Sequence, residues 1–244
     1  MTAVSSAQLL AAWERGLTQP PARRALTLLN ADGDGGTFDA LARLSIGERD
    51  KRLLCLHEQM FGPRLQAIAH CPACGESLEV DFNVADARVE PTEPASGPFT
   101  LEHEEYVVAF RLPASLDLAS LDENAATVAN RRRLVELCIL SAFCGGSVIS
   151  ADELPDETVA AIAAQMAKAD PQAEVLITMQ CPACPHRWSA PLDIGAFFWA
   201  ELNTWATRML REVHLLAAAY GWREPDILAL SPRRRQLYLE MLER

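Results

Sequence analysis

Four of the seven cysteines in this 244-residue chain form two matched pairs that could bind one metal ion. The pairs lie in the sequences Cys71-Pro-Ala-Cys74 and Cys181-Pro-Ala-Cys184. A Cys-x-x-Cys turn directs two sulfurs to one side of a metal, so two such turns supply the four ligands of a tetrahedral structural zinc site. The proline inside each turn restricts φ and favours a tight turn. We therefore predict one structural zinc ion, held by Cys71, Cys74, Cys181 and Cys184.

Other uses of the paired cysteines remain open. A redox-active pair lies where a strand enters a helix, whose N-terminus lowers the thiol pKa, whereas alternating apolar residues predict strands on both sides of each pair. Two disulfides would require an oxidising compartment, and we expect a chain without an export signal. The site could also be degenerate and have lost its metal. His186 is an alternative fourth ligand, because Pro185 has no N–H to donate to a sulfur and could loosen the second turn.

A site of four cysteines predicts a structural role rather than catalysis. Catalytic zinc keeps one coordination position open for water, whereas four cysteines fill the tetrahedral shell. The sequence contains neither a glycine-rich phosphate loop nor a Gly-x-Ser-x-Gly elbow. Residues 75–180 separate the two pairs, far more than the ~15–20 residues of a compact zinc ribbon. We therefore expect a non-enzymatic protein in which zinc joins two distant segments. The remaining cysteines lie in apolar patterns and are expected to pack in the core, namely Cys55, Cys138 and Cys144.

The composition argues against nucleic-acid and membrane binding. The net charge is −11 and the sequence pI is about 4.9, whereas a general nucleic-acid binder needs a positive surface to displace counterions from phosphates. The same sign disfavours anionic membrane surfaces. The first residues lack the basic and apolar stretches of a secretory signal, and no run approaches the ~18 apolar residues that span a bilayer. We therefore expect a soluble, cytoplasmic protein.

The spacing of apolar residues predicts an α+β fold, mostly helical, in three regions. Residues 1–62 form an N-terminal helical region, and residues 194–244 form a C-terminal helical module. Between them, residues 63–193 form a zinc-ribbon-like pair of β-hairpins with a helical insertion at about residues 99–172. The hairpins are predicted from strict alternation of apolar residues around each cysteine pair.

Three further segments can be assigned from their residue types. The segment from Asn124 to Cys144 carries an apolar stripe and is predicted as one long helix. Pro91–Pro98 is polar and proline-rich and is predicted as a linker. Asp32–Gly36 resembles part of a calcium loop, but Thr37 and Arg43 occupy the positions that need glycine and glutamate. We therefore interpret Asp32–Gly36 as a turn.

The last helices carry two features that bear on partner binding. An apolar stripe runs from Phe198 to Tyr220 and is ended by Gly221, after which two short helices follow. An arginine run, Arg233–Arg235, lies at the start of the final helix, where the helix dipole disfavours positive charge. Either the arginines are solvated and the stripe covers the short helices, or the module docks an acidic partner. For docking, the candidate residues are Trp222, Arg233, Arg234, Arg235 and Tyr238.

The C-terminal sequence resembles a known family. Its pattern is a Glu-Val-His helix followed by Tyr220-Gly-Trp222, Asp226-Ile-Leu-Ala-Leu-Ser-Pro232, Arg233-Arg-Arg235 and Tyr238-Leu-Glu240. Together with Phe110-Arg-Leu-Pro113, Leu116-Asp-Leu118 and the two Cys-Pro-Ala-Cys pairs, it resembles the T4-type phage baseplate hub assembly family. Members of that family occur in contractile injection system gene clusters and are described as assembly chaperones. The resemblance loosely covers residues 50–244 and is specific only in the C-terminal stretch.

Two classes of function compete for this sequence. The resemblance implies a non-enzymatic baseplate component or assembly factor of a contractile, phage-tail-like particle, with baseplate, hub or spike proteins as partners. The alternative is a zinc-ribbon protein that binds nucleic acid or acts in transcription. The alternative is supported by the ribbon motif and by arginine runs at residues 131–133 and 233–235, but the acidic net charge opposes it.

Overall fold

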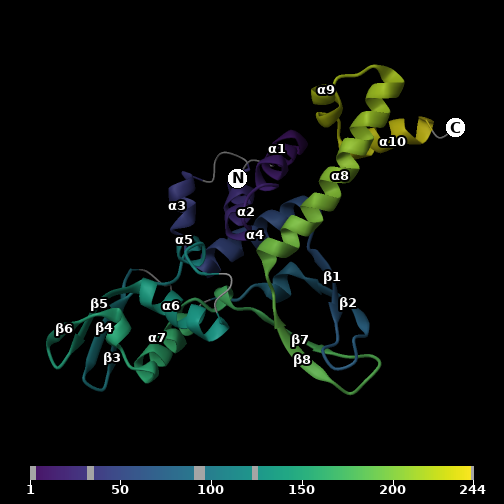
Figure 1. Ribbon diagram of the computed structural model, residues 1–244. Coiled ribbons are helices and arrows are strands. Elements are labelled where there is room, and N and C mark those ends of the chain that lie inside the picture. The colour runs from purple at the N-terminus through teal and green to yellow at the C-terminus, as the bar shows by residue number, and fades with distance from the viewer. Residues whose placement is uncertain (1–3, 32–35, 91–96, 123–125, 243–244) are drawn as a thin grey trace. The chain divides into compact units, whose positions relative to one another are not determined.

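The computed structural model describes residues 4–31, 36–90, 97–122 and 126–242 and shows a helix-rich chain with small antiparallel sheets (Figure 1). This confirms the predicted α+β class. The chain forms two compact units, which we call the terminal unit (residues 1–38 and 193–244) and the central unit (residues 39–192). The division of the chain into three domains, at residues 1–62, 63–193 and 194–244, stays a prediction. Residues 32–35 of the predicted turn and 91–96 of the predicted linker lie outside the described residues.

The helices of the terminal unit are α1 (Ser6–Gly16), α2 (Pro21–Leu29), α8 (Ile194–Tyr220), α9 (Glu224–Leu228) and α10 (Pro232–Leu242). Local sequence signals set their ends. Ser5 caps α1, because its hydroxyl accepts from the Gln8 N–H while the Gln8 side chain accepts from the Ser5 N–H. Pro21 opens α2, where no backbone donor is needed. Gly221 ends α8 with the left-handed φ of +67° that the sequence predicts there.

Helix α8 supplies the core of the terminal unit and packs against α1, α2, α9 and α10. The predicted apolar stripe from Phe198 to Tyr220 is buried except at Trp205, which is half-buried, and at its last position, because Tyr220 is exposed. A Cβ on Gly16 would lie 2.3 Å from the Trp199 ring, so α1 can approach α8 only where a side chain is missing. Among the described residues, no helix combines the length and apolar content needed to cross a bilayer. The buried stripe of α8 is Ile194, Phe198, Leu202, Ala206, Met209, Val213 and Leu216.

The helices of the central unit are α3 (Phe38–Ala42), which begins on the last residue of the terminal unit, α4 (Ile46–Phe61), α5 (Ser115–Leu118), α6 (Thr127–Cys138) and α7 (Asp156–Ala169). Its strands are β1 (Arg64–His70), β2 (Ser77–Asn83), β3 (Phe99–His103), β4 (Tyr106–Phe110), β5 (Ile139–Cys144), β6 (Ser147–Ile149), β7 (Leu176–Gln180) and β8 (Arg187–Pro191). Short 3-10 turns lie at Val84–Ala87, Ala151–Glu153 and Pro171–Ala173.

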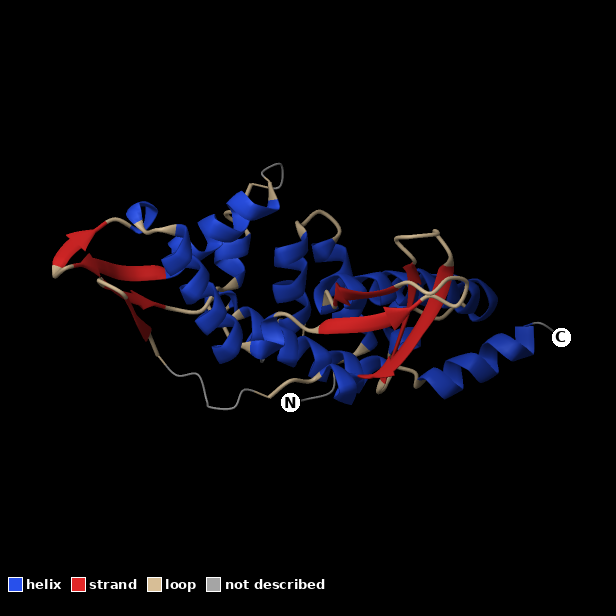
Figure 2. Ribbon diagram, turned by 90° about the horizontal axis from the view of Figure 1, so that it is seen from below, coloured by secondary structure: helices blue, strands red, loops and turns tan. Residues whose placement is uncertain are grey.

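Two antiparallel hairpins carry the cysteine pairs in their turns (Figure 2). Strand β1 pairs with β2, and β7 pairs with β8. Along each strand, exposed residues alternate with more buried ones, which is the pattern of a sheet with one covered face. The hairpins follow the alternation seen in the sequence, so this part of the prediction is confirmed.

The segment between the hairpins contains a sheet as well as helices. Its four strands are antiparallel in the order β3-β4-β5-β6. Helices α6 and α7 pack on one face of this sheet (Figure 1). The predicted long helix Asn124–Cys144 is wrong in its last six residues, since α6 ends at Cys138 and β5 (Ile139–Cys144) follows. Pairing of β5 with β4 sets Ala142 beside Val108 in the apolar core, and this tertiary contact overrides the helical spacing of the sequence.

Hydrogen bonds join the end of this insertion to α4 and to residues 87–89. The Gly47 N–H, in the first turn of α4, donates to Asp170 Oδ2 at 2.9 Å. A Cβ on Gly47 would lie 1.9 Å from Asp170 Oδ1, so only glycine permits this approach. The side chain of Gln172 accepts from the Val89 N–H at 2.8 Å and donates to the Ala87 carbonyl at 3.0 Å. The Gly47 bond holds α4 beside the segment that follows α7, and the two bonds of Gln172 join that segment to residues 87–89.

Candidate metal centre

The two cysteine turns meet at one point in the central unit. The Sγ atoms of Cys71 and Cys184 lie 3.8 Å apart, and those of Cys74 and Cys181 lie 3.6 Å apart. All four sulfurs lie within 4.8 Å of one another. Four sulfurs at ~2.3 Å from a tetrahedral zinc ion would be about 3.8 Å apart. The four cysteines could therefore hold a metal ion with little movement.

Backbone N–H groups lower the pKa values of these thiols, whereas burial raises them. Burial raises the pKa of the Cys71 thiol, but the N–H groups of Ala73 and Cys74 donate to its sulfur and bring the pKa down to about 7. The Glu76 N–H lowers the pKa of Cys74, but the neighbouring Cys181 thiol and burial outweigh it and raise that pKa to about 12. One thiolate forms readily, whereas further ionisation places like charges together. A bound cation would relieve that repulsion.

The second turn differs from the first at Pro185. In the first turn, the Gly75 N–H donates to the Cys71 carbonyl at 2.8 Å. Pro185 stands at the equivalent position and has no N–H, so that bond is absent from the second turn. The N–H that donates to the Cys184 sulfur belongs to His186, one residue beyond the proline. Proline therefore removes one backbone bond from the turn but leaves the amide that faces the sulfur.

The geometry also bears on the other interpretations of the cysteines. All seven cysteines are free thiols. Strands β2 and β8 follow the two pairs, so neither pair lies at the start of a helix that could activate a thiol. The His186 ring is not part of the four-sulfur group and stacks on Trp188 at a ring distance of 5.9 Å. Of the other cysteines, Cys138 lies in the sheet core, where burial raises the pKa of its thiol to about 12. Cys55 and Cys144 are half-buried on α4 and β5.

Residues 32–199 match a family model described as T4 bacteriophage base plate protein. The match covers more than half of the chain and includes both cysteine pairs. The chain belongs to this baseplate protein family. The resemblance found in the sequence is thereby confirmed at the level of T4-type baseplate proteins, although the matched residues end before the C-terminal stretch that carried most of it. No curated protein and no solved structure matches the chain significantly.

In this baseplate protein, the three C-terminal arginines do not form one surface. Arg235 is only 3% exposed. Its Nε donates to Glu212 Oε2 at 2.9 Å, and its Nη1 donates to the Leu230 carbonyl at 2.8 Å. The prediction that Arg235 contacts a partner is therefore corrected, because packing of α10 on α8 turns this side chain inward. Arg233 and Arg234 are exposed.

The aromatic residues of the C-terminal module pack partly on one another. Trp222 lies 4.8 Å from both Tyr220 and Tyr238, measured between ring centroids. Ile227 is fully buried with residues of α8. Helix α8 thus covers one side of the short helices, as the alternative reading of the sequence anticipates. Exposed apolar side chains remain on α10, namely Leu237 at 47%, Met241 at 60% and Leu242 at 39%.

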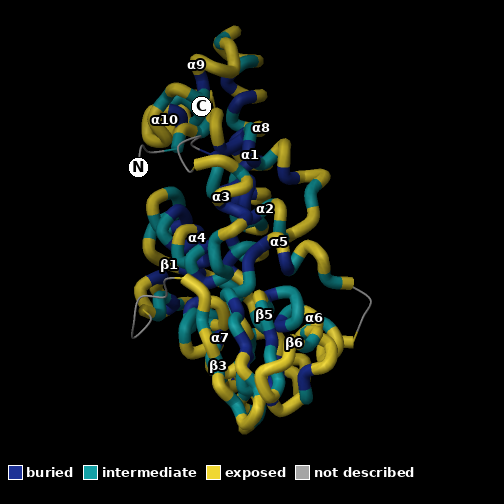
Figure 3. Tube along the Cα trace, turned by 90° about the vertical axis from the view of Figure 1, so that its left-hand side faces the viewer, coloured by how far each residue is buried: buried dark blue, intermediate teal, exposed yellow. Residues whose placement is uncertain are grey.

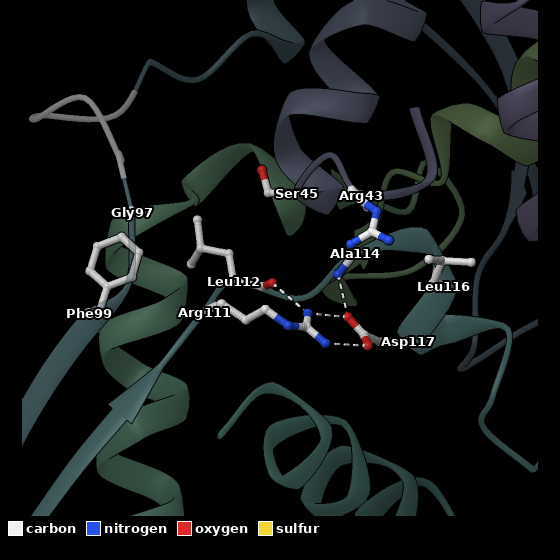
Figure 4. A pocket seen from close by; sticks show the side chains of 9 residues that line it. All are labelled: Arg43, Ser45, Gly97, Phe99, Arg111, Leu112, Ala114, Leu116 and Asp117. Carbon is white, nitrogen blue, oxygen red and sulfur yellow. Dashed lines mark hydrogen bonds and ion pairs between the residues drawn. The ribbon is translucent and has the colours of Figure 1, made fainter. Parts of the chain in front are cut away.

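A pocket lies beside the start of α4 in the central unit of the baseplate protein (Figure 4). Asp117 binds Arg111 through two hydrogen bonds of 2.6 and 2.8 Å. Burial raises the pKa of the Asp117 carboxyl, but Arg111 and the Ala114 N–H outweigh it and hold the pKa below its usual range. Arg111 and Asp117 neutralise each other, so we interpret this ion pair as stabilising the fold. This pocket is not predicted from the sequence, although the two segments Phe110–Pro113 and Leu116–Leu118 quoted for the family resemblance supply part of its lining. The lining residues are Arg43, Ser45, Gly97, Phe99, Arg111, Leu112, Ala114, Leu116 and Asp117.

Proposed function

We propose that this protein is a non-enzymatic structural or assembly component of the baseplate of a phage-tail-like contractile injection system. We also propose that one zinc ion holds its central unit together. Membership of the baseplate family supports the first part. The cluster of four sulfurs, at spacings close to those of a tetrahedral site, supports the second.

Zinc would join two hairpins that are far apart in the chain. Cys74 and Cys181 are 107 positions apart, so one ion would close a loop that contains β3–β6 and α5–α7. A two-stranded hairpin is marginal on its own in water. Structural zinc contributes roughly 10 kcal/mol or more to the folding of isolated zinc peptides. A contribution of that size is enough to order both hairpins.

Elemental analysis of protein purified in reducing buffer without chelator tests the metal site. We expect about one equivalent of zinc per chain and no visible colour, whereas iron in a tetrahedral sulfur site would absorb visible light. Cys71→Ser and Cys181→Ser should each lose the zinc and leave partly unfolded protein. Cys55→Ala, which changes a half-buried cysteine on α4, is the matched control and should keep both zinc and fold. A wild-type zinc content near zero would refute this part of the proposal.

The exposed side of α10 is the proposed contact for another baseplate, hub or spike protein. Arg233 and Arg234 form no ion pair with a described residue and lie at a helix start that disfavours positive charge. Such residues are suited to meet acidic groups of a partner. Trp222 and Tyr238 are half-buried, pack on each other and offer aromatic surface in the same C-terminal module.

Pull-down from a strain that carries the whole gene cluster tests the proposed contact. The double variant R233E/R234E should fold like wild type, because exposed charges contribute little to stability. We expect it to lose its baseplate partners. The control R15E/R211E makes the same charge change at two exposed arginines of the same unit and should retain them. Equal recovery of partners by both variants would remove Arg233 and Arg234 from the contact.

The nucleic-acid alternative has less support from the arginine runs than the sequence suggests. Arg132 pairs with Glu136 and Asp156, and Arg133 also lies close to Glu136. Arg235 is paired with Glu212. These acidic neighbours reduce the positive charge available to phosphates. We therefore keep the baseplate role as the proposed function.

A further inference from the structure

One face of the four-stranded sheet presents an apolar row to solvent. The register sets Glu102 opposite Val107, Val107 opposite Phe143, and Phe143 opposite Val148. Residues opposite each other across strands share a face, so these four form one row across β3, β4, β5 and β6. Val107 is 41% exposed and Val148 is 77% exposed. The opposite face carries the residues buried against α6 and α7, among them Val108, Phe110 and Ala142.

One end of this row is acidic. Glu102 lies on the edge strand β3, and Glu104 and Glu105 form the turn between β3 and β4. All three are exposed, and none forms an ion pair with another described residue. An apolar strip with carboxylates at one end matches a partner surface that has apolar side chains and a positive end.

Helix α10 carries that complementary pattern. Arg233, Leu237 and Met241 recur every four residues, so they lie along one side of the helix. All three are exposed, and most of α10 is coloured as exposed in Figure 3. This stripe spans ~12 Å, from eight residues at a rise of 1.5 Å each. The row on the sheet spans ~14 Å, from three strand spacings of ~4.8 Å. In both, a charge is followed by apolar groups.

We propose that α10 of one copy of this chain docks on the β3–β6 sheet of a second copy. Arg233 then lies near Glu102, while Leu237 and Met241 cover Val107, Phe143 and Val148. The inference rests on the proposed function only in using α10 as a docking element. The two surfaces differ, so a docked pair of copies still has one free sheet face and one free α10. Such a contact extends into a ring, or into an open chain where the rotation between copies does not close.

Sedimentation of the purified full-length protein over a wide concentration range tests this contact. Wild type should form oligomers as its concentration rises. Arg233→Glu and Glu102→Arg should each weaken association about tenfold or more, because each replaces an attraction by a repulsion. A mixture of the two variants, and the double variant E102R/R233E, should regain association. Restoration by opposite charges distinguishes a direct contact from a general loss of solubility.

A valine pair provides the apolar control. Val148→Ser should weaken association, whereas Val128→Ser, at a position on α6 that is 80% exposed, should not. A protein that stays monomeric at all concentrations would overturn the inference, and so would variants that associate like wild type. Neither result affects the baseplate role, because zinc content and pull-down of baseplate partners are measured separately. Wild-type protein that self-associates normally but recovers no baseplate partners would instead count against the proposed function alone.

Discussion

Replacing Arg235 by alanine should loosen α10 from α8. The side chain of Arg235 is 4% exposed and that of Glu212 is 17% exposed, so the pair lies mostly out of water. Removing one partner of a buried ion pair costs ~3–5 kcal/mol, and the Leu230 carbonyl also loses its donor. Glu212 keeps some access to water and lies 3.8 Å from Arg208. We therefore expect the low end of the range, about 3 kcal/mol.

Amide hydrogen exchange is the assay suited to this change. Helix α10 packs on α8, so the loss should appear first as local opening of α10. A cost of about 3 kcal/mol corresponds to exchange on the order of 100-fold faster. Arg233→Ala removes an exposed arginine from the same helix and should stay within about 0.5 kcal/mol of wild type. Wild-type exchange rates in the Arg235→Ala variant would refute the buried pair and return Arg235 to the candidate contact residues.

Three further outcomes follow from the structure. Gly16→Ala should lower stability by ~1–3 kcal/mol in thermal denaturation, because the new methyl group would lie 2.3 Å from the Trp199 ring; Gly195→Ala, whose nearest contact would be 3.4 Å, should be milder. The depressed pKa of Asp117, due to Arg111 and the Ala114 N–H against the effect of burial, means that its ion pair stabilises the fold above the unfolded pKa of about 4 and is lost as the pH falls through the folded value. Urea unfolding should therefore find Asp117→Asn less stable than wild type at neutral pH, with the difference shrinking in acid. Nucleic-acid binding should be weak at physiological salt, and an affinity that falls steeply with added salt would contradict this.

The parts of the fold that depend on residues close together in the sequence could be predicted from it. The cysteine hairpins follow from local alternation around each Cys-Pro-Ala-Cys, and the end of α8 follows from Gly221. Strand β5 could not be found in this way, because residues 139–144 continue the apolar spacing of α6 and become a strand only by pairing with β4. The burial of Arg235 depends on Glu212, which is 23 positions away and on another helix. Both errors come from contacts that the sequence does not place side by side.

Two sulfur contacts in the metal centre join different hairpins, since Cys71 Sγ lies 3.8 Å from Cys184 Sγ and Cys74 Sγ lies 3.6 Å from Cys181 Sγ. Air oxidation of metal-free protein across these contacts would link one hairpin to the other, after the sulfurs move closer by ~1.5–2 Å. The crosslinked chain would contain a covalent ring of more than one hundred residues and should migrate faster than the reduced chain on a denaturing gel without reductant. A preparation that lost its zinc during handling could thus keep the same two segments joined and still look folded. Comparing its gel mobility with and without reductant would show that a disulfide has replaced the zinc ion.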